Sequence, residues 1–446
     1  MTAAPDMPGA EAPPVRQLRL LGQRRFWPLF WVQFLGALND HVFKNAFMAL
    51  LTWRLADRLG LNLDVHVLFA GALYILPFAL VAGTAGQIAD GVDKARMMRV
   101  VKAAEIGLMA AAAVAFHLQS LWMLYLLLFL MGAQSAVFAP IKYAVLPSLL
   151  PRRELMAGNG LVQSATFLAI VLGQILGIKV ALAPGGVGAV SGAVIALATL
   201  GFLASLYAAP MPPAGPAPRP DPTLVRAMVG VVRDCRRHPT PFFAILAIMW
   251  FWFAGATFLT LILPIAKETL HAGEDAALAL LFAFVAGLAA GAALTNLATR
   301  GRITLALPPV GALGIAAGAV LFWLAASGYG AGLDRTGPLL GLDGFLARPD
   351  AWGVMGAAFL MAVFAGLYVV PLNAIYTLSA PEAERGRFVA CSNILDAGAM
   401  VLASLFAMAL LTAGLSREAV FAVVGLTGVL AAAVLIRRHR TAPLDL

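Results

Sequence analysis

The stretch Phe34-Leu-Gly-Ala-Leu-Asn-Asp-His-Val-Phe-Lys-Asn-Ala-Phe47 lies inside an apolar run that extends from about Phe26 to Trp53. At about 1.5 Å per helical residue, this run measures about 40 Å, which is long enough to cross a lipid bilayer with some tilt. Its middle carries a group of polar or ionisable side chains, at Asn39, Asp40, His41, Lys44 and Asn45. The sequence therefore predicts a membrane-spanning helix with a polar centre.

Asp40 and Lys44 are the most informative residues of this helix. A charged side chain at the centre of a bilayer costs about 2.5–3.5 kcal/mol, so ionisable residues there usually serve function. At about 100° per residue, Asp40, His41, Lys44 and Asn45 fall within a wedge of about 140°. We predict that the wedge faces a cavity and that these residues, with Asn39, bind substrate. The alternative is that Asp40 and Lys44, which are i,i+4 neighbours, form a structural pair that pins the helix to another.

The composition is that of a helical protein with many membrane spans. Of its 446 residues, 61% are hydrophobic and only 12% are charged, whereas soluble domains carry about 25% charged residues. The two cysteines exclude a disulfide framework, and the six scattered histidines form no metal-binding spacing. We therefore expect no metal, no cofactor and no nucleic-acid partner.

Hydropathy predicts twelve transmembrane helices in two halves of six. The expected spans are 26–53, 66–89, 97–117, 121–143, 158–182, 186–209, 241–266, 275–298, 303–326, 351–378, 388–413 and 418–437. The Pro-rich segment 210–240 separates residues 26–209 from residues 241–437, and we expect it to form a cytoplasmic linker with a basic amphipathic helix. Residues 1–25 and 438–446 are expected to be cytoplasmic tails.

The distribution of Lys and Arg sets the expected orientation. If the N-terminus is inside, twenty-three of the 31 basic residues, Lys102 among them, fall in or near cytoplasmic segments and six fall outside. Cytoplasmic loops of membrane proteins carry such an excess. We therefore expect both termini in the cytoplasm.

Corresponding interruptions of the two halves indicate where a site lies. Pro140-Ile-Lys142 stands at the end of the fourth span and Pro371-Leu-Asn373 in the tenth. Matching breaks in an internal repeat point to a site between the halves. Lys142, Tyr143 and Asn373 are therefore predicted to join the substrate site, although Lys142 suits a snorkelling role equally well.

The loop Gly86-Gln-Ile-Ala-Asp90-Gly-Val-Asp93-Lys94-Ala-Arg96 resembles a loop of the major facilitator superfamily between the second and third helices. The resemblance implies that Asp90, Asp93, Lys94 and Arg96 act in gating. The Arg that usually follows the first Asp is Gly91 here. The alternative is an ordinary basic cytoplasmic loop.

Three further blocks resemble the lysophospholipid transporter family of that superfamily. They are Arg25–Asn45, Gly132–Pro147 and Val369–Ile375, the last followed by Arg385, Arg387 and Asn393. The resemblance implies a major facilitator fold and a flippase that moves lysophosphatidylethanolamine and its relatives from the outer to the inner leaflet of the bacterial inner membrane. His41 departs from the family, in which a second Asn is usual, and this departure bears on the choice of headgroup.

The resemblance also implies a stand-alone monomer that serves a separate acyltransferase or acyl-carrier-protein synthetase. In this reading Lys44 meets the phosphate, Asp40 meets the ammonium, and the two halves rock around the site. Arg385, Arg387 and Asp396 are expected to gate, with Asp396 paired to one of the two arginines. A drug/proton antiporter of the same fold, a membrane-embedded enzyme using His41 and Asp40, and a non-transporting receptor remain as alternatives; we expect a transporter and not an enzyme.

Overall fold

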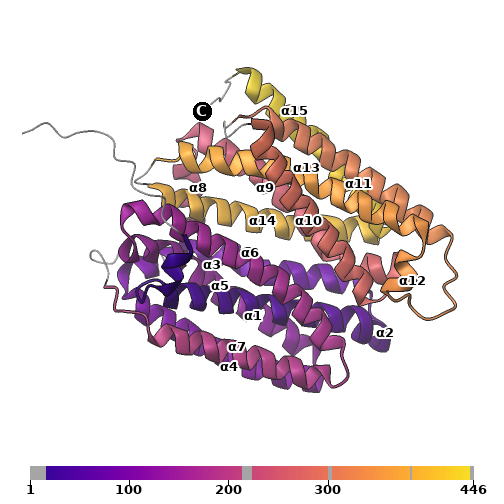
Figure 1. Ribbon diagram of the computed structural model, residues 1–446, viewed down its shortest axis with the longest axis horizontal. Coiled ribbons are helices and arrows are strands. Elements are labelled where there is room, and N and C mark those ends of the chain that lie inside the picture. The colour runs from indigo at the N-terminus through magenta and orange to yellow at the C-terminus, as the bar shows by residue number, and fades with distance from the viewer. Residues whose placement is uncertain (1–16, 213–223, 300–303, 382–383, 442–446) are drawn as a thin grey trace, which may run out of the picture.

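The computed structural model describes residues 17–212, 224–299, 304–381 and 384–441. The described chain is almost entirely helical and contains no strand, although a β-bridge joins Ala272 to Leu340. Figure 1 shows two bundles, one formed by the indigo-to-magenta half of the chain and one by the red-to-yellow half. The prediction of an all-α membrane protein is confirmed.

Twelve long helices make up the two bundles. The first half contains α1 (Trp27–Leu50), α3 (Leu63–Gly91), α4 (Lys94–Leu118), α5 (Leu121–Leu149), α6 (Arg152–Leu182) and α7 (Gly186–Leu206). The second half contains α9 (Pro239–Pro264), α10 (Glu274–Thr299), α11 (Leu307–Ala331), α13 (Pro349–Ser379), α14 (Arg385–Thr412) and α15 (Arg417–Thr441). Eleven of them are long and apolar enough to cross a membrane. The exception is α1, whose polar centre lowers its hydropathy.

Short elements connect the long helices. They are η1 (Gln17–Gly22), η2 (Leu51–Leu55), α2 (Ala56–Leu59), α8 (Leu224–Cys235), η3 (Ile265–Thr269) and α12 (Leu342–Leu346). The predicted linker helix is α8. Both η2 and η3 are π-helical segments that continue the first long helix of their half. This shared irregularity supports an internal repeat.

Local sequence explains where several helices begin and end. The side chain of Asn62 accepts a hydrogen bond from the backbone N–H of Val65 and caps α3, and Asp93 caps α4 in the same way through Arg96. Proline in the first turn begins α1, α9, α11 and α13. The prolines after Leu307 explain why α11 begins later than the predicted span at residue 303.

Glycines bring α6 unusually close to α1. A Cβ atom added at Gly173 would lie 2.5 Å from the Cβ of His41, and one at Gly177 would lie 2.7 Å from the carbonyl oxygen of Val42. Neither position tolerates a larger residue without displacement of the α1 backbone. The polar centre of α1 is thus held in place by direct helix–helix contact.

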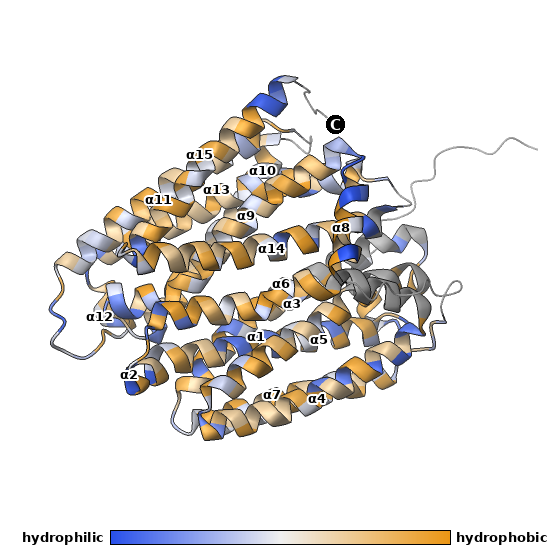
Figure 2. Cartoon of the chain, turned by 180° about the vertical axis from the view of Figure 1, so that it is seen from behind, coloured by the Kyte–Doolittle hydropathy of each residue, from blue (hydrophilic) through white to orange (hydrophobic). Residues whose placement is uncertain are grey.

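The outer surface of the bundles is apolar. Hydrophobic residues cover the outward faces of the helices, and hydrophilic residues gather near α8 and at the end of α15 (Figure 2). Large exposed side chains include Trp122, Phe282, Leu297 and Leu430. An apolar surface of this extent is expected to face lipid. Between the halves, α3 packs against α14.

Candidate functional site

The polar centre of α1 points into the first half and not toward lipid. Asn39 is completely buried and Asp40 is 7% exposed. Asn45 is buried, and His41 and Lys44 are partly buried. The predicted wedge is therefore shielded from the bilayer by neighbouring helices.

Asp40 is held by helices α3 and α5 and not by Lys44. The hydroxyl of Ser135 on α5 donates to Asp40 Oδ2, and the Tyr74 side chain on α3 is a second hydrogen-bonding neighbour of the carboxylate. The Lys44 ammonium lies over the Tyr74 ring, 5.4 Å from its centroid. The Asp40–Lys44 ion pair, which was the alternative interpretation of this helix, does not occur among the described residues, because each group contacts a different partner on α3 or α5.

A second ionisable group lies next to Asp40 and was not predicted. Glu105 on α4 accepts from Asn39 Nδ2 at 2.8 Å, from Lys102 Nζ at 2.5 Å and from Gln134 Nε2 at 3.1 Å. The side chains of Lys102 and Glu105 are 2% and 1% exposed. Ser135 also donates to Gln134 Oε1 at 3.1 Å, so one polar network connects Glu105 to Asp40 across α1, α4 and α5.

Lys102 is buried inside the first half and does not lie in a cytoplasmic segment, so the count of cytoplasmic basic residues made from the sequence is one too high. It is buried between α1, α5 and α7, with its ammonium 5.4 Å from the centroid of the Phe138 ring. A Cβ atom at Gly36 would lie 2.2 Å from Lys102 Nζ. The i,i+3 spacing of Lys102 and Glu105 within an apolar helix was a sequence signal for this pair, by the same reasoning that identified Asp40.

Two acceptor oxygens in the polar centre of α1 lack a partner among the described residues. Asn39 Oδ1 and Asp40 Oδ1 are buried and accept no hydrogen bond from any described residue. Buried polar atoms of proteins are rarely left in this state. Both atoms are acceptors, so a ligand that satisfies them must bring donors.

His41 and Asn45 contribute less to this site than predicted. The Asn45 side chain donates to the His41 carbonyl oxygen at 2.8 Å within α1. The His41 backbone and Cβ face Gly173 of α6, and its buried Nδ1 atom has no partner among the described residues. The two residues lie on the α6 side of the wedge, away from the Glu105 network.

Among the substrate and gating residues expected near the cytoplasm, some have side chains that the structure describes and others do not. Asn373 is exposed and donates to the carbonyl oxygen of Val369 on its own helix, 3.1 Å away. The side chains of Lys142, Tyr143, Asp90 and Arg385 lie outside the described residues. The structure therefore does not bring Asn373 to the α1 wedge in this conformation.

Asp93 fixes the start of α4. It accepts from the backbone N–H of Arg96 at 2.8 Å and of Met211 at 2.7 Å. The N–H of Lys94 in turn donates to the Met211 carbonyl oxygen at 3.1 Å. Lys94 is buried and Arg96 is exposed. Asp93 thereby connects the loop before α4 to the segment that follows α7.

The expected Asp396–Arg387 pair is not formed in this conformation. Arg387 instead lies 3.5 Å from the carboxylate of Asp234 on α8. The Ser392 hydroxyl, one turn earlier on α14, donates to Asp396 at 2.9 Å. The linker helix supplies a nearer acid for Arg387 than its own helix does.

Ion pairs join the two halves at the end that the basic-residue distribution places outside. Lys267 Nζ lies 2.5 Å from Asp57 and donates to the Thr52 carbonyl oxygen at 2.8 Å. Arg417 pairs with Asp64 at 2.6 Å, and Lys179 pairs with Asp275. Lys179 is therefore bound to the other half. These contacts hold this end of the molecule closed, and the sequence offered no means to match their partners.

The family model of the Major Facilitator Superfamily matches residues 29–340. The chain belongs to this superfamily. Among solved structures, a D-xylose–proton symporter superimposes with a TM-score of 0.64 at 14% identity, covering 92% of this chain and 97% of its own. A bacterial homologue of the human lysosomal transporter Spinster gives a TM-score of 0.63 at 15% identity, covering 93% and 95% of the two chains. These likenesses confirm the major facilitator fold.

Two curated members of the superfamily are similar to this chain over most of its length. The lysophospholipid transporter LplT of Cronobacter sakazakii is 27% identical over 378 residues, covering 83% of this chain and 84% of its own. LplT of Escherichia coli strain SE11 is 26% identical over 385 residues, with the same coverage. The predicted resemblance to lysophospholipid transporters within the superfamily is thus confirmed, and the chain is a multi-pass membrane protein with an LplT-like sequence.

Proposed function

We propose that this protein is a flippase that carries lysophospholipids, such as lysophosphatidylethanolamine, from the outer to the inner leaflet of the bacterial inner membrane. The observation that carries the proposal is the pair of buried, unpartnered acceptors on Asn39 and Asp40, on the same helix as Lys44, whose ammonium lies over the Tyr74 ring. A zwitterionic headgroup matches these groups, because it offers a donor ammonium and an acceptor phosphate together.

The ammonium of the headgroup would bind at Asp40. Its N–H groups can satisfy Asp40 Oδ1 and Asn39 Oδ1 while Ser135 continues to hold Asp40 Oδ2. Charge-assisted hydrogen bonds of this kind are about twice as strong as neutral ones. Glu105 acts as a positioning residue, since it accepts from the Asn39 amide nitrogen and leaves the amide oxygen free.

The phosphate of the headgroup would bind at Lys44. This ammonium has no anionic partner within ion-pair distance among the described residues and rests on the face of Tyr74. A phosphate is a stronger partner than an aromatic ring. Lys102 is unsuited to this role because Glu105 already neutralises it in a sealed position.

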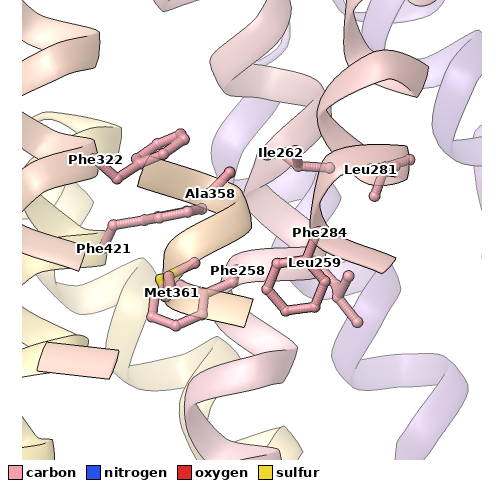
Figure 3. Close-up of a pocket in the computed structure, with 9 residues that line it drawn as sticks. All are labelled: Phe258, Leu259, Ile262, Leu281, Phe284, Phe322, Ala358, Met361 and Phe421. Atoms are coloured by element: carbon pink, nitrogen blue, oxygen red, sulfur yellow. The ribbon is translucent and has the colours of Figure 1, made fainter. Parts of the chain in front are cut away.

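The acyl tail needs an apolar slot, and the second half contains a small apolar cleft that would have to widen to hold one. It is lined entirely by hydrophobic side chains from α9, α10, α11, α13 and α15, including Phe258, Phe284 and Met361 (Figure 3). A neighbouring cleft shares these three residues and extends the apolar seam to Phe251. Of the adjacent aromatic residues on α9, Phe251 lines the second cleft, whereas Trp250 donates to Thr427 and packs on Tyr368.

Transport would proceed by alternating access between the halves. In the present conformation Asp57–Lys267, Asp64–Arg417 and Lys179–Asp275 close one end. If that end faces outward, these pairs must separate to admit a lipid from the outer leaflet. We further propose that the protein works as a monomer with both termini in the cytoplasm, and that a separate acyltransferase consumes the lipid it delivers.

The decisive experiment follows a fluorescent lysophosphatidylethanolamine in proteoliposomes. The lipid is added to the outer leaflet, and the fraction that albumin can no longer extract is measured over time. We expect faster protection than in empty liposomes and competition by unlabelled lysophosphatidylethanolamine. Equal rates with and without protein would refute the flippase; proton-coupled uptake of cationic drugs by the same vesicles would favour the antiporter instead.

A further inference from the structure

The only two cysteines of the chain meet in the fold. Cys235 is the last residue of the linker helix α8, and Cys391 lies in the first two turns of α14. Both side chains are completely buried, and their thiols hydrogen-bond to each other. Separated in sequence by more than a third of the chain, they form a contact that the sequence did not indicate.

Independent contacts hold the two thiols together. Cys235 Sγ lies 3.8 Å from the carbonyl oxygen of Arg387, which stands one helical turn before Cys391. Cys235 and Cys391 belong to one buried cluster with Ile245, Ala380 and Phe388. Two side-chain contacts flank this cluster, the ion pair Arg387–Asp234 at 3.5 Å and the contact between His238 and Glu384 at 3.8 Å.

We propose that Cys235 and Cys391 form a dithiol site that a two-electron oxidant such as hydrogen peroxide converts reversibly into an intramolecular disulfide. One thiolate attacks the peroxide O–O bond, becomes a sulfenic acid and releases water after protonation. The second thiol then attacks that sulfur, an S–S bond forms, and a second water leaves. Two thiols are oxidised, and one peroxide is reduced to two waters.

Cys235 is the better first nucleophile of the pair. The hydrogen bond from Cys391 lowers the pKa of the Cys235 thiol, because it stabilises the thiolate. A lower pKa raises the thiolate fraction, and the thiolate is the reacting form. Cys391, as donor, stands in position to resolve the sulfenic acid. Burial of both sulfurs restricts the site to small, uncharged oxidants.

The disulfide would fix the linker helix to one half of the transporter. In the reduced protein α8 packs against both α3 of the first half and α14 of the second. A covalent bond to α14 makes α8 a permanent part of the second half, so that any relative movement must separate α8 from α3. This inference concerns the linker and does not depend on the identity of the substrate.

The test uses the full-length protein in lipid nanodiscs. Samples are treated with hydrogen peroxide, denatured in the presence of a maleimide–polyethylene glycol reagent, and examined on a non-reducing gel. We expect the reduced protein to gain two mass tags, the oxidised protein to gain none, and dithiothreitol to restore both. Mass spectrometry of the oxidised wild type should find the peptide containing Cys235 linked to the one containing Cys391.

Two single variants provide the controls. Cys235→Ser and Cys391→Ser should each keep one tag after a brief peroxide treatment, since neither can form the internal bond. The proposal is overturned if the wild type keeps both tags at peroxide levels that oxidise a reference dithiol protein. It is equally overturned if the oxidised product is a sulfinic acid without a cross-link, or a disulfide between two molecules.

Discussion

The two halves share a fold but differ in what they bury. The first half encloses two acids, two lysines and the amides of Asn39 and Gln134 in one polar region. The corresponding part of the second half encloses an apolar seam around Phe258 and Met361. The two halves have the same arrangement of helices, so we expect the residues that differ between their interiors to be the ones that serve function. A polar half facing an apolar half suits a substrate that is itself polar at one end and apolar at the other.

The largest expected effect comes from the buried pair that distinguishes the first half. Lys102→Met leaves Glu105 buried without its cation, and breaking such a pair costs about 3–5 kcal/mol. We expect a marked fall in the thermal denaturation midpoint in detergent. Lys179→Met removes a half-exposed pair and should cost less than about 1 kcal/mol. Equal midpoints for the two variants would mean that the buried network does not stabilise the first half.

The next effect concerns transport and not stability. Asp40→Asn removes the charge proposed to bind the ammonium. Loss of a buried charged contact weakens the binding free energy by about 2 kcal/mol or more. We expect inward transfer of lysophosphatidylethanolamine to fall by at least about 30-fold. Asp350→Asn, at the exposed start of α13, is the matched control and should transport normally. Transfer by Asp40→Asn within twofold of the wild type would remove Asp40 from the site.

A smaller effect is expected where the two halves meet. Lys267→Gln removes the pairing to Asp57 and weakens the contact with Thr52. A loss of about 1 kcal/mol would raise the open population about fivefold. Opening is measured with a Thr52→Cys reporter in a protein whose two native cysteines are replaced by serine. Thr52 is fully buried, so an impermeant maleimide can label the new cysteine only when this end opens, and the labelling rate reports the open population.

Arg54→Gln is the control for this measurement, because Arg54 donates to the Leu182 carbonyl oxygen within the first half and makes no ion pair with the second half among the described residues. It should leave the labelling rate unchanged. If the reporter cysteine is labelled no faster in Lys267→Gln than in Arg54→Gln, the Lys267–Asp57 ion pair does not contribute to closure.

The smallest expected effect tests the apolar half. Ala358→Leu adds bulk to the cleft beside Met361 and should reduce transfer of long-chain lysolipids about threefold relative to short-chain ones. Leu360→Phe, on the exposed side of the same helix, should leave this ratio unchanged. A chain-length ratio that Ala358→Leu does not alter would locate the acyl tail elsewhere.

Much of the fold followed from hydropathy alone. Uninterrupted apolar runs of about 20 residues predict membrane helices with little ambiguity, and all twelve long helices lie at the expected places. The polar residues of α1 were identified because burying charge is costly. Lys102 was assigned to the cytoplasmic side because a lysine near a basic loop is usually solvated, and its acid one turn later was overlooked.

Pairings were predicted less well than positions. Asp40 and Lys44 are close enough on one helix to pair, but helix spacing permits a contact without requiring it, and Ser135 and Tyr74 compete successfully. Arg387 binds Asp234 from a distant segment. Such partners depend on which helices become neighbours, and local sequence carries no information about that choice.

The π-helical segments at the ends of α1 and α9 have a consequence for how the halves fit together. Lys267 belongs to η3, and the carbonyl oxygen that it binds belongs to Thr52 of η2. A π segment is usually a single turn set within an α-helix, equivalent to one inserted residue. Converting η2 into α-helix of the same length would turn everything beyond it by about 100° and direct Asp57 away from Lys267. The contact between the halves at this end thus depends on the backbone register that the π turns set, and not on the side chains alone.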